Sequence, residues 1–420
     1  MTEEPGRAAF EGLLTQTATA ALMRVLNRDG EETRLVGGVV RNALMHRPTT
    51  DIDLATTALP EEVTRRAHAS GWKVIPTGVD HGTVTVIIDG SPFEVTTLRE
   101  DMETDGRHAV VQFGRDFAAD ARRRDFTINA LSVSMDGRVH DYCDGLADIA
   151  GRRVRFIGIA EERIREDYLR ILRFFRFHAQ YGEGEPDRVG LLAAIREREG
   201  LDRVSAERIR AELLKLMAGK RAAEVLVVMA DSGFLTRIFG GAVEFGRLRR
   251  VMDSATRVPT VLRLAAFATM VGEDADRLRD RLRLSNSEHM TLLEFASLVE
   301  RLKNLPTSVD IPALRRLAAH WPVNVLAAAI SALSAETRPD IDPAAASLLG
   351  RYADGTEQVP VFPLRGADFV ARGLAKGPEV GRAMSLARKL WLDAGCPEGN
   401  GEAERLLDET MTFLAISGRH

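Results

Sequence analysis

Cysteine is scarce in this sequence, with only Cys143 and Cys396 among 420 residues. Two cysteines exclude a framework of disulfide bonds, and their scarcity suits a reducing compartment. No apolar run is long enough to cross a bilayer, and residues 1–10 are polar and acidic, unlike the core of a signal peptide. These absences predict a cytoplasmic protein that has no membrane association.

Positive charge is limited as well. The net charge is −4 at pH 7, which excludes a globally basic nucleic-acid-binding surface. The distribution is uneven, because residues 151–180 hold eight arginines against four acids. Only six of the 57 basic residues are lysine. Arginine forms better bidentate contacts with phosphates and base edges than lysine does, although genome composition is an alternative explanation for this bias.

The periodicity of apolar residues changes near residue 150. Before it, residues 73–76, 83–88 and 93–98 alternate or are β-branched, as strands are, and residues 133–140 resemble a hairpin. After it, apolar residues recur at helical spacing, for example over residues 163–181 and 288–305. With an ordinary 45% of apolar residues, the chain is predicted to be α+β, with an all-α remainder after the mixed N-terminal part.

Two aspartates one residue apart suggest a metal site. Asp51 and Asp53 lie in a predicted strand, where residues i and i+2 face the same side. Adjacent carboxylates repel each other unless a divalent cation lies between them. Just before them, Gly37-Gly38 follows a short apolar strand and precedes a predicted helix, whose free N–H groups attract an anion. A metal site beside a phosphate site indicates nucleotide chemistry, although each motif alone is more often a solvated loop or a plain turn.

A second motif is the arginine run at residues 122–124, followed by Asp125 and Asn129. If residues 125–130 begin a helix, Asp125 and Asn129 share one helical face. This arrangement predicts Arg124 on a phosphate, with Asp125 and Asn129 near a ribose. The alternative is a solvated patch of charge.

The third motif, residues 161–177, places Asp167, Arg170 and Arg173 at i, i+3 and i+6 of a predicted helix. Cytosine and adenine both present an amino donor beside a ring-nitrogen acceptor, whereas guanine and uracil present the reverse order. A carboxylate accepts from the amino group and a guanidinium donates to the ring nitrogen. Asp167 and Arg170 are therefore predicted to select C and A without a template. A salt-bridged amphipathic helix is the alternative.

The sequence resembles the class II tRNA nucleotidyltransferases, the CCA-adding enzymes, which have bacterial poly(A) polymerases as close relatives. The resemblance covers residues 34–217 and rests on five stretches that occur in the expected order. These are residues 35–41 (LVGGVVR), 50–56 (TDIDLAT), 123–130 (RRDFTINA), 166–173 (EDYLRILR) and 205–215 (SAERIRAELLK).

The resemblance implies a polymerase-β-like nucleotidyltransferase head at residues 1–150. A neck at 151–220 that recognises the base, a helical body at 221–300 and a tRNA-binding tail at 301–420 would follow. It implies Mg²⁺ on Asp51 and Asp53, and tRNA, CTP and ATP as partners; no obligate protein partner is evident. Together with the motifs above, the predicted nucleotide-binding residues are Gly37, Gly38, Arg41, Arg124, Asp125, Asn129, Asp167, Arg170, Arg173 and Arg176. Asn42 departs from the family, which usually has aspartate there, so a charged contact at this position is in doubt.

The expected reaction is template-independent addition of CMP and AMP to the tRNA 3′ end, with release of pyrophosphate and two metal ions. Glu94 is either an additional catalytic carboxylate or a structural residue. The mildly acidic C-terminus and the polar loop at residues 99–113 favour an enzyme that completes CCA. A poly(A) polymerase and an enzyme that adds only CC or only A remain alternatives. A non-catalytic RNA-binding protein on a decayed nucleotidyltransferase fold is an alternative of another class.

Overall fold

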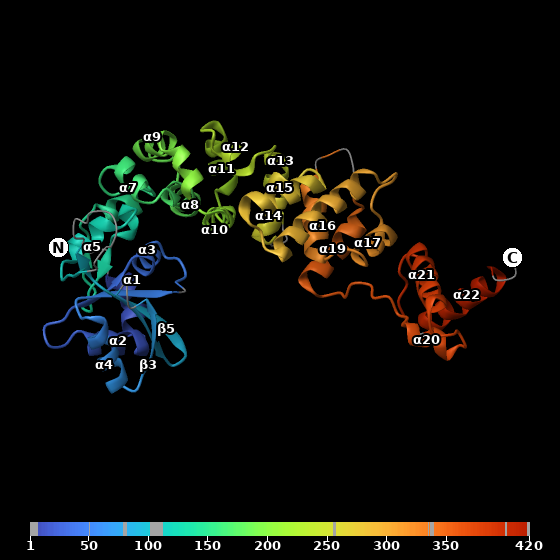
Figure 1. Cartoon of the computed structure of the whole chain (residues 1–420), viewed down its shortest axis with the longest axis horizontal. Helices are drawn as coiled ribbons and strands as arrows, with labels where there is room; N and C mark the ends of the chain where they lie inside the picture. Colours follow the sequence, from blue (N-terminus) through green and yellow to red (C-terminus); the bar gives the residue numbers. More distant parts are fainter. Residues whose placement is uncertain are drawn as a thin grey trace. The chain divides into compact units, whose positions relative to one another are not determined.

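A computed structural model describes residues 7–49, 51–78, 82–100, 112–254, 258–334, 336, 340–399 and 401–417. The chain divides into two compact units (Figure 1). The first contains Met1–Ser205 and Gly219–Arg221, and the second contains Ala206–Ala218 and Ala222–His420. The division into head, neck, body and tail is finer than this partition and stays a prediction.

The first unit is built on a mixed sheet of seven strands in the order β3-β4-β5-β2-β1-β8-β9. Strands β2 and β5 run parallel, whereas the other neighbouring pairs are antiparallel. The strands span Thr33–Val36 (β1), Ile52–Thr56 (β2), Lys73–Gly78 (β3), Thr83–Ile88 (β4), Ser91–Thr97 (β5), Ser132–Val133 (β8) and Val139–His140 (β9). The predicted strands and the hairpin at residues 133–140 are confirmed.

A second, two-stranded ladder joins the ends of the predicted polar loop. Strand β6 (Arg99–Glu100) pairs antiparallel with β7 (Gln112–Phe113). Residues 101–111, which make up most of that loop, lie outside the described residues.

Helices cover the sheet and extend the first unit beyond it. Helix α3 packs on β1 and β2, and α4 packs on β3 and β4. The helices are α1 (Arg7–Thr15), α2 (Thr17–Leu26), α3 (Gly38–Leu44), α4 (Pro60–Ala69), α5 (Phe117–Arg123), α6 (Gly145–Ala150), α7 (Ala160–Glu166), α8 (Leu169–Tyr181) and α9 (Arg188–Arg196), with 3₁₀ turns η2 (Thr127–Asn129) and η3 (Arg198–Arg203).

Three local predictions about helices were wrong. Residues 163–181 form two helices, because the chain leaves α7 at Asp167, where φ is −156°. The Tyr168 ring packs so closely on Gly200 that a Cβ there would lie 1.9 Å from Tyr168 Cδ1. Residues 125–130 form only the short turn η2, and the arginine run ends a helix, α5, instead of preceding one.

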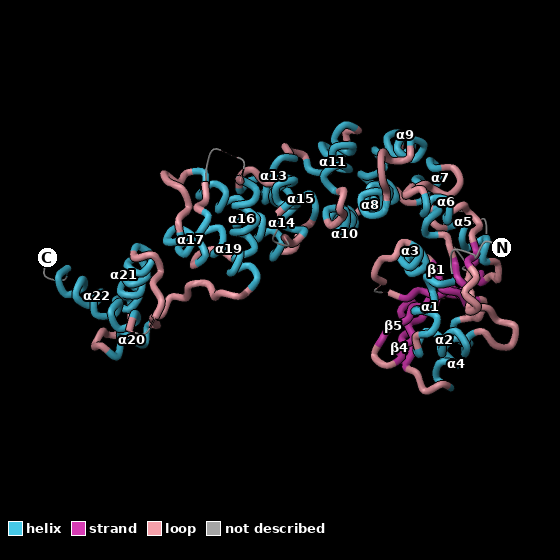
Figure 2. Tube along the Cα trace, turned by 180° about the vertical axis from the view of Figure 1, so that it is seen from behind, coloured by secondary structure: helices cyan, strands magenta, loops and turns pink. Residues whose placement is uncertain are grey.

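The second unit is helical in its described residues (Figure 2). Its core includes α18, where eight residues of an apolar helix are buried among α13, α14, α16 and α19. The helices are α10 (Ala206–Met217), α11 (Ala222–Asp231), α12 (Phe234–Phe239), α13 (Phe245–Asp253), α14 (Thr260–Ala268), α15 (Gly272–Leu282), α16 (Asn286–Lys303), α17 (Ile311–Ala318), α18 (Val323–Leu333), α19 (Pro343–Asp354), α20 (Gly366–Ala371), α21 (Pro378–Asp393) and α22 (Glu402–Ser417). The α+β prediction is confirmed.

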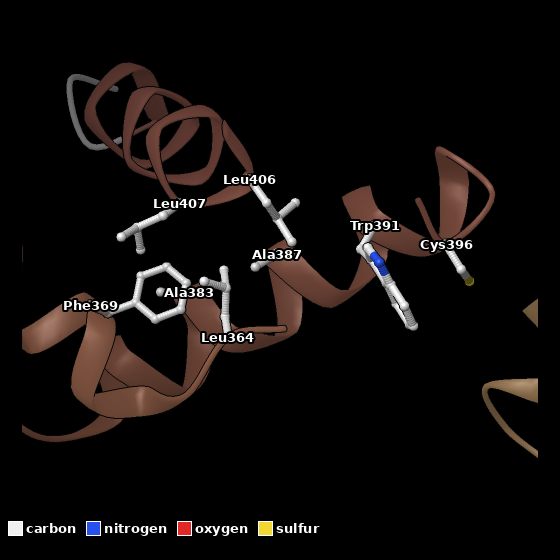
Figure 3. Packing of buried hydrophobic residues seen from close by; sticks show 8 residues of the cluster. All are labelled: Leu364, Phe369, Ala383, Ala387, Trp391, Cys396, Leu406 and Leu407. Carbon is white, nitrogen blue, oxygen red and sulfur yellow. The ribbon is translucent and has the colours of Figure 1, made fainter. Parts of the chain in front are cut away.

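The last three helices enclose a hydrophobic cluster of their own (Figure 3). Trp391 is 1% exposed, and its indole N–H donates to the Pro397 carbonyl oxygen at 3.1 Å. The buried members are Leu364, Phe369, Ala383, Ala387, Trp391, Cys396, Leu406 and Leu407. None of the helices in the described part of the chain combines the length and the apolar character that a membrane crossing requires.

Candidate active site

The carboxylates of the candidate site lie on the two parallel strands. Asp53 of β2 stands opposite Glu94 of β5 in the ladder, so the two side chains are neighbours on one face of the sheet. Asp51 directly precedes β2. Burial raises the pKa of Asp53, and the negative charges of Glu94 and Asp51 raise it further, while Arg124 opposes them. This is a concentration of negative charge that a cation would relieve.

A cavity of about 520 Å³ opens beside these carboxylates within the first unit. The sheet forms one wall, and strand β6, helices α5, α7 and α8 and the residue after α5 supply the charged residues of the others. Its charged lining consists of the acids Asp53, Glu94, Asp120 and Glu166 and the arginines Arg99, Arg123, Arg124, Arg163 and Arg170. Five guanidinium groups near two sheet carboxylates provide both the phosphate-binding and the metal-binding chemistry of a nucleotide site.

Gly37 makes room for Arg124 at the end of β1. Its φ of +69° favours glycine, and a Cβ there would lie 2.7 Å from Arg124 Nη1. The Arg124 guanidinium is held by Asp120 at 3.2 and 3.3 Å and donates to the Asn129 carbonyl oxygen at 3.3 Å. Gly38 begins α3, where a Cβ would meet Arg41 only at an ordinary 3.6 Å. The predicted glycine turn is present, and its positive φ lies at Gly37.

The Arg41 guanidinium hydrogen-bonds to other side chains of the protein. It donates to Asn129 Oδ1 at 2.5 Å, to Asn42 Oδ1 at 2.9 Å and to the Tyr181 hydroxyl at 2.8 Å. It also lies 4.0 Å from the centre of the Tyr181 ring. Burial lowers the pKa of Arg41 to about 10, and the nearby Arg176 and Arg47 contribute to the lowering. Arg41 therefore connects α3, η2 and α8.

Asp125 continues the hydrogen bonds of Arg41 and Asn129. Together with Arg173 these residues form what we call the buried network. Arg173 donates to its Oδ2 atom at 2.7 and 2.5 Å, while the Asn129 side chain and the Phe126 N–H donate to Oδ1. Burial acts to raise the pKa of Asp125, but the Arg173 charge and these hydrogen bonds outweigh it and lower the pKa. Asp125 and Asn129 thus fix the end of α8 nearest the cavity against the turn η2.

Asp167 and Arg170 are separated by the break between α7 and α8. The Asp167 carboxylate accepts from the Leu169 N–H at 3.1 Å, which favours the start of α8. Arg170 donates to the Arg163 carbonyl oxygen at 2.7 Å and pairs with Glu166. Arg170 lines the cavity. Arg176 lies 4.1 Å from the centre of the Phe177 ring.

The structure places seven of the predicted residues in two adjoining groups. Gly37, Gly38, Asp51, Asp167 and Arg176 are not among the residues that line the cavity or form the buried network. Asp53, Arg124 and Arg170, together with Glu94, line the cavity. Arg41, Asp125, Asn129 and Arg173 form the buried network, which meets the cavity where Arg124 contacts Asn129. Sequence reasoning did not single out the lining residues Arg99, Asp120 and Arg163. Arg163 donates to the carbonyl oxygens of Arg122 and Arg124 at 2.8 and 2.9 Å, which joins α7 to the end of α5.

Two family models match this chain. Residues 33–155 match the Poly A polymerase head domain, and residues 191–243 match the probable RNA and SrmB-binding site of polymerase A. The first match contains both strands that carry the sheet carboxylates.

Similarity to whole proteins extends further. The mitochondrial CCA tRNA nucleotidyltransferase 1 of Danio rerio is 34% identical over 402 residues, covering 91% of this chain and 88% of that protein. The CCA-adding enzyme of Leuconostoc citreum is 42% identical over 214 residues, about half of each chain (50% and 52%). The crystal structure of the Bacillus stearothermophilus CCA-adding enzyme in complex with CTP superposes with a TM-score of 0.73 at 26% identity. That alignment covers 98% of this chain and 99% of the other.

Proposed function

This chain belongs to the family of CCA-adding tRNA nucleotidyltransferases, and we propose that it adds C, C and A to the 3′ end of tRNA from CTP and ATP. The observation that carries the proposal is the arginine-lined cavity, because it contains both Asp53 of the sheet and Arg170 of α8. One end can therefore hold the reacting phosphates while the other contacts the base.

The donor set fits a metal ion, and we propose Mg²⁺. Among the described residues, no three carboxylate, histidine or cysteine side chains converge closely enough to enclose an ion by themselves. Mg²⁺ in nucleotide sites is commonly held by one or two carboxylates together with phosphate oxygens and water, so Asp51 and Asp53 suffice. When bound, the metal activates the primer hydroxyl and offsets charge on the leaving pyrophosphate.

The protein groups have distinct tasks in this proposal. Asp51 and Asp53 hold the metal, and Glu94 adds negative charge beside Asp53. Arg124, seated against Gly37, binds the triphosphate. The tRNA 3′-OH attacks the α-phosphorus, the bond to the bridging oxygen breaks, and pyrophosphate leaves. Asp167 and Arg170 select the base. The buried Arg41, Asp125, Asn129 and Arg173 hold these elements in place, and their contact with the nucleotide stays a prediction.

Labelled CTP and ATP, supplied with tRNA that lacks CCA, test the proposal when the products are sequenced. We expect a complete CCA end and no addition to tRNA that already ends in CCA. Asp51→Ala and Asp53→Ala should each lower turnover on the order of 10³-fold at saturating Mg²⁺, because metal stabilisation of the transition state is worth several kcal/mol. Long A tails would instead indicate a poly(A) polymerase, and products ending in CC an enzyme that adds only CC. No incorporation at all would indicate a non-catalytic RNA-binding protein.

The location in the cell stays a prediction. A cytoplasmic site follows from the low cysteine content, while the Danio rerio relative is named mitochondrial. Fractionation of the source cells with an antibody against this chain tests it directly.

A further inference from the structure

Asn42 lies in the last turn of α3. The chain reverses just after it, through His46 with φ of +53°. The Arg47 N–H donates to the Asn42 backbone carbonyl oxygen at 2.8 Å, which closes the turn. The segment that leaves this turn leads through Pro48 to Asp51 and into β2. Asn42 therefore lies at the start of the segment that leads to Asp51 and Asp53.

The Asn42 side chain makes two contacts of opposite kind. Its Oδ1 atom accepts from Arg41 Nη2 at 2.9 Å and from Arg41 Nε at 3.2 Å. Its Nδ2 atom donates to the Pro48 carbonyl oxygen at 3.2 Å. Arg41 offers only donors and a carbonyl offers only acceptors, so both partners independently require the same orientation of the amide. An aspartate in the same position has no proton to offer to Pro48 at neutral pH.

The Arg41 end of this link is rigid. Arg41 is 6% exposed and is fixed by Asn129 and Tyr181 as well as by Asn42. The Pro48 end is exposed, and its carbonyl oxygen accepts the hydrogen bond from Asn42. Through its hydrogen bonds to Arg41 and to Pro48, Asn42 therefore connects the buried network to the chain just before Asp51 and can restrain it.

We propose that Asn42 is a positioning residue, which ties the segment before the two metal-binding aspartates to the buried Arg41 network. This inference rests on the proposed function, because it takes Asp51 and Asp53 to be the metal ligands. An aspartate at this position would keep the contact to Arg41, but it would place a carboxylate oxygen against the Pro48 carbonyl oxygen. The hydrogen bond to Pro48, called the tether below, would be replaced by a repulsion between two oxygens, although the side-chain shape is unchanged.

The test measures Mn²⁺ binding to the full-length protein by electron paramagnetic resonance, in the absence of nucleotide and RNA. Asn42→Asp should raise the Mn²⁺ dissociation constant about threefold, the effect expected for one partly exposed hydrogen bond. The Mg²⁺ concentration that gives half-maximal CTP incorporation should rise in the same ratio.

Asn27→Asp is the matched control. Asn27 also donates through Nδ2 to two carbonyl oxygens, of Met23 at 2.8 Å and of Thr33 at 3.3 Å, but at the opposite end of β1 from Gly37. We expect Asn27→Asp to lower the melting temperature while it leaves Mn²⁺ affinity unchanged. If Asn42→Asp does not fold, Asn42→Ala carries the test, with weaker Mn²⁺ binding expected for the same reason.

The outcomes separate the tether from the metal site. Wild-type Mn²⁺ affinity in a folded Asn42 variant, with binding lost in Asp53→Ala, overturns the tether and leaves the metal site standing. Wild-type affinity in Asp53→Ala overturns the metal assignment and with it the basis of this inference. Weaker binding in Asn42→Asp and Asn27→Asp alike would show a general loss of stability and also overturn the tether.

Discussion

Arg124 fills the space that Gly37 leaves open: its Nη1 atom lies 2.7 Å from the point where a Cβ on residue 37 would stand. The glycine turn therefore has a steric role as well as a conformational one. It allows a guanidinium from beyond α5 to reach the wall of the cavity next to the end of β1.

Gly37→Ala should impair both folding and activity. A non-glycine residue at φ of +69° costs about 1–3 kcal/mol of folding stability. The new methyl group also displaces Arg124, so CTP incorporation should fall about tenfold or more, as expected when a charged hydrogen-bond donor is lost from the transition state. Gly71→Ala is the control, because Gly71 has φ of +77° with open space around it. Equal loss of activity in both variants would show that backbone strain, and not Arg124, is responsible.

Asp53→Asn should abolish activity and yet stabilise the metal-free protein at neutral pH. The pKa of Asp53 is raised in the folded state by burial and by Glu94 and Asp51, so its ionised form opposes folding. Asparagine removes that opposing charge. The stability gained should shrink as the pH falls below the folded-state pKa and vanish below the ordinary value of 3.8, where the wild-type carboxyl is protonated in both states. Thermal unfolding in EDTA across this pH range measures the effect, and a less stable Asp53→Asn protein would contradict it.

Asp125→Asn should destabilise the fold. It removes one partner of a pair in which the Asp125 side chain is 9% exposed and that of Arg173 is 32% exposed. We expect a loss of about 2 kcal/mol, less than for a fully buried pair because water still reaches Arg173. The lowered pKa of Asp125 gives stability that is present above its ordinary value of 3.8 and is lost as the pH falls through the folded-state pKa. The difference between variant and wild type should therefore shrink in acid.

Urea unfolding at several pH values measures this loss. Asp408→Asn, in an exposed pair with Arg372, is the control and should change stability by about 0.5 kcal/mol or less. A pH-independent difference between Asp125→Asn and wild type would show that the charge on Asp125 is not what stabilises the contact.

Asp167→Asn separates base selection from helix capping. Asparagine still offers an oxygen to the Leu169 N–H, so the start of α8 should survive. Its amide also offers a donor where the carboxylate could only accept. Discrimination between CTP and UTP should therefore fall about tenfold, the effect of roughly one strong hydrogen bond.

Single-nucleotide incorporation on primers that end before C measures the selectivity of Asp167→Asn. Arg165→Ala is the control, because Arg165 is exposed on α7 and pairs with Glu197. Unchanged selectivity in Asp167→Asn would leave Asp167 only its role at the start of α8.

Much of the site was predictable because its signals are local. The alternating strands and the glycine turn are each short local patterns, and the structure confirms them. The strand predicted to contain both Asp51 and Asp53 begins only at Ile52, so Asp51 lies just outside it. The placement of Glu94 beside Asp53 depends on the register between β2 and β5, which the sequence does not specify. The contact of Arg173 with Asp125 spans 48 residues and is likewise tertiary.

The helices show the same limit. The helical spacing of Ile164, Ile171 and Phe175, at steps of seven and four, continues across the break between α7 and α8, so periodicity alone predicts one helix. At the break Tyr168 packs on Gly200, which is 32 residues away in sequence, and apolar periodicity does not show such a tertiary contact. Helix α5 has only seven residues, too few for a clear periodic signal, although Asp116 caps it.

The five cations that line the cavity are all arginines. A guanidinium stays protonated throughout the pH range in which proteins fold, so the positive charge of this wall is constant across that range. Lysine acetylation, which switches off positive charge at many phosphate sites, has no target among these five groups. The positive charge of the cavity wall is thereby independent both of cellular acidification and of the supply of acetyl donors.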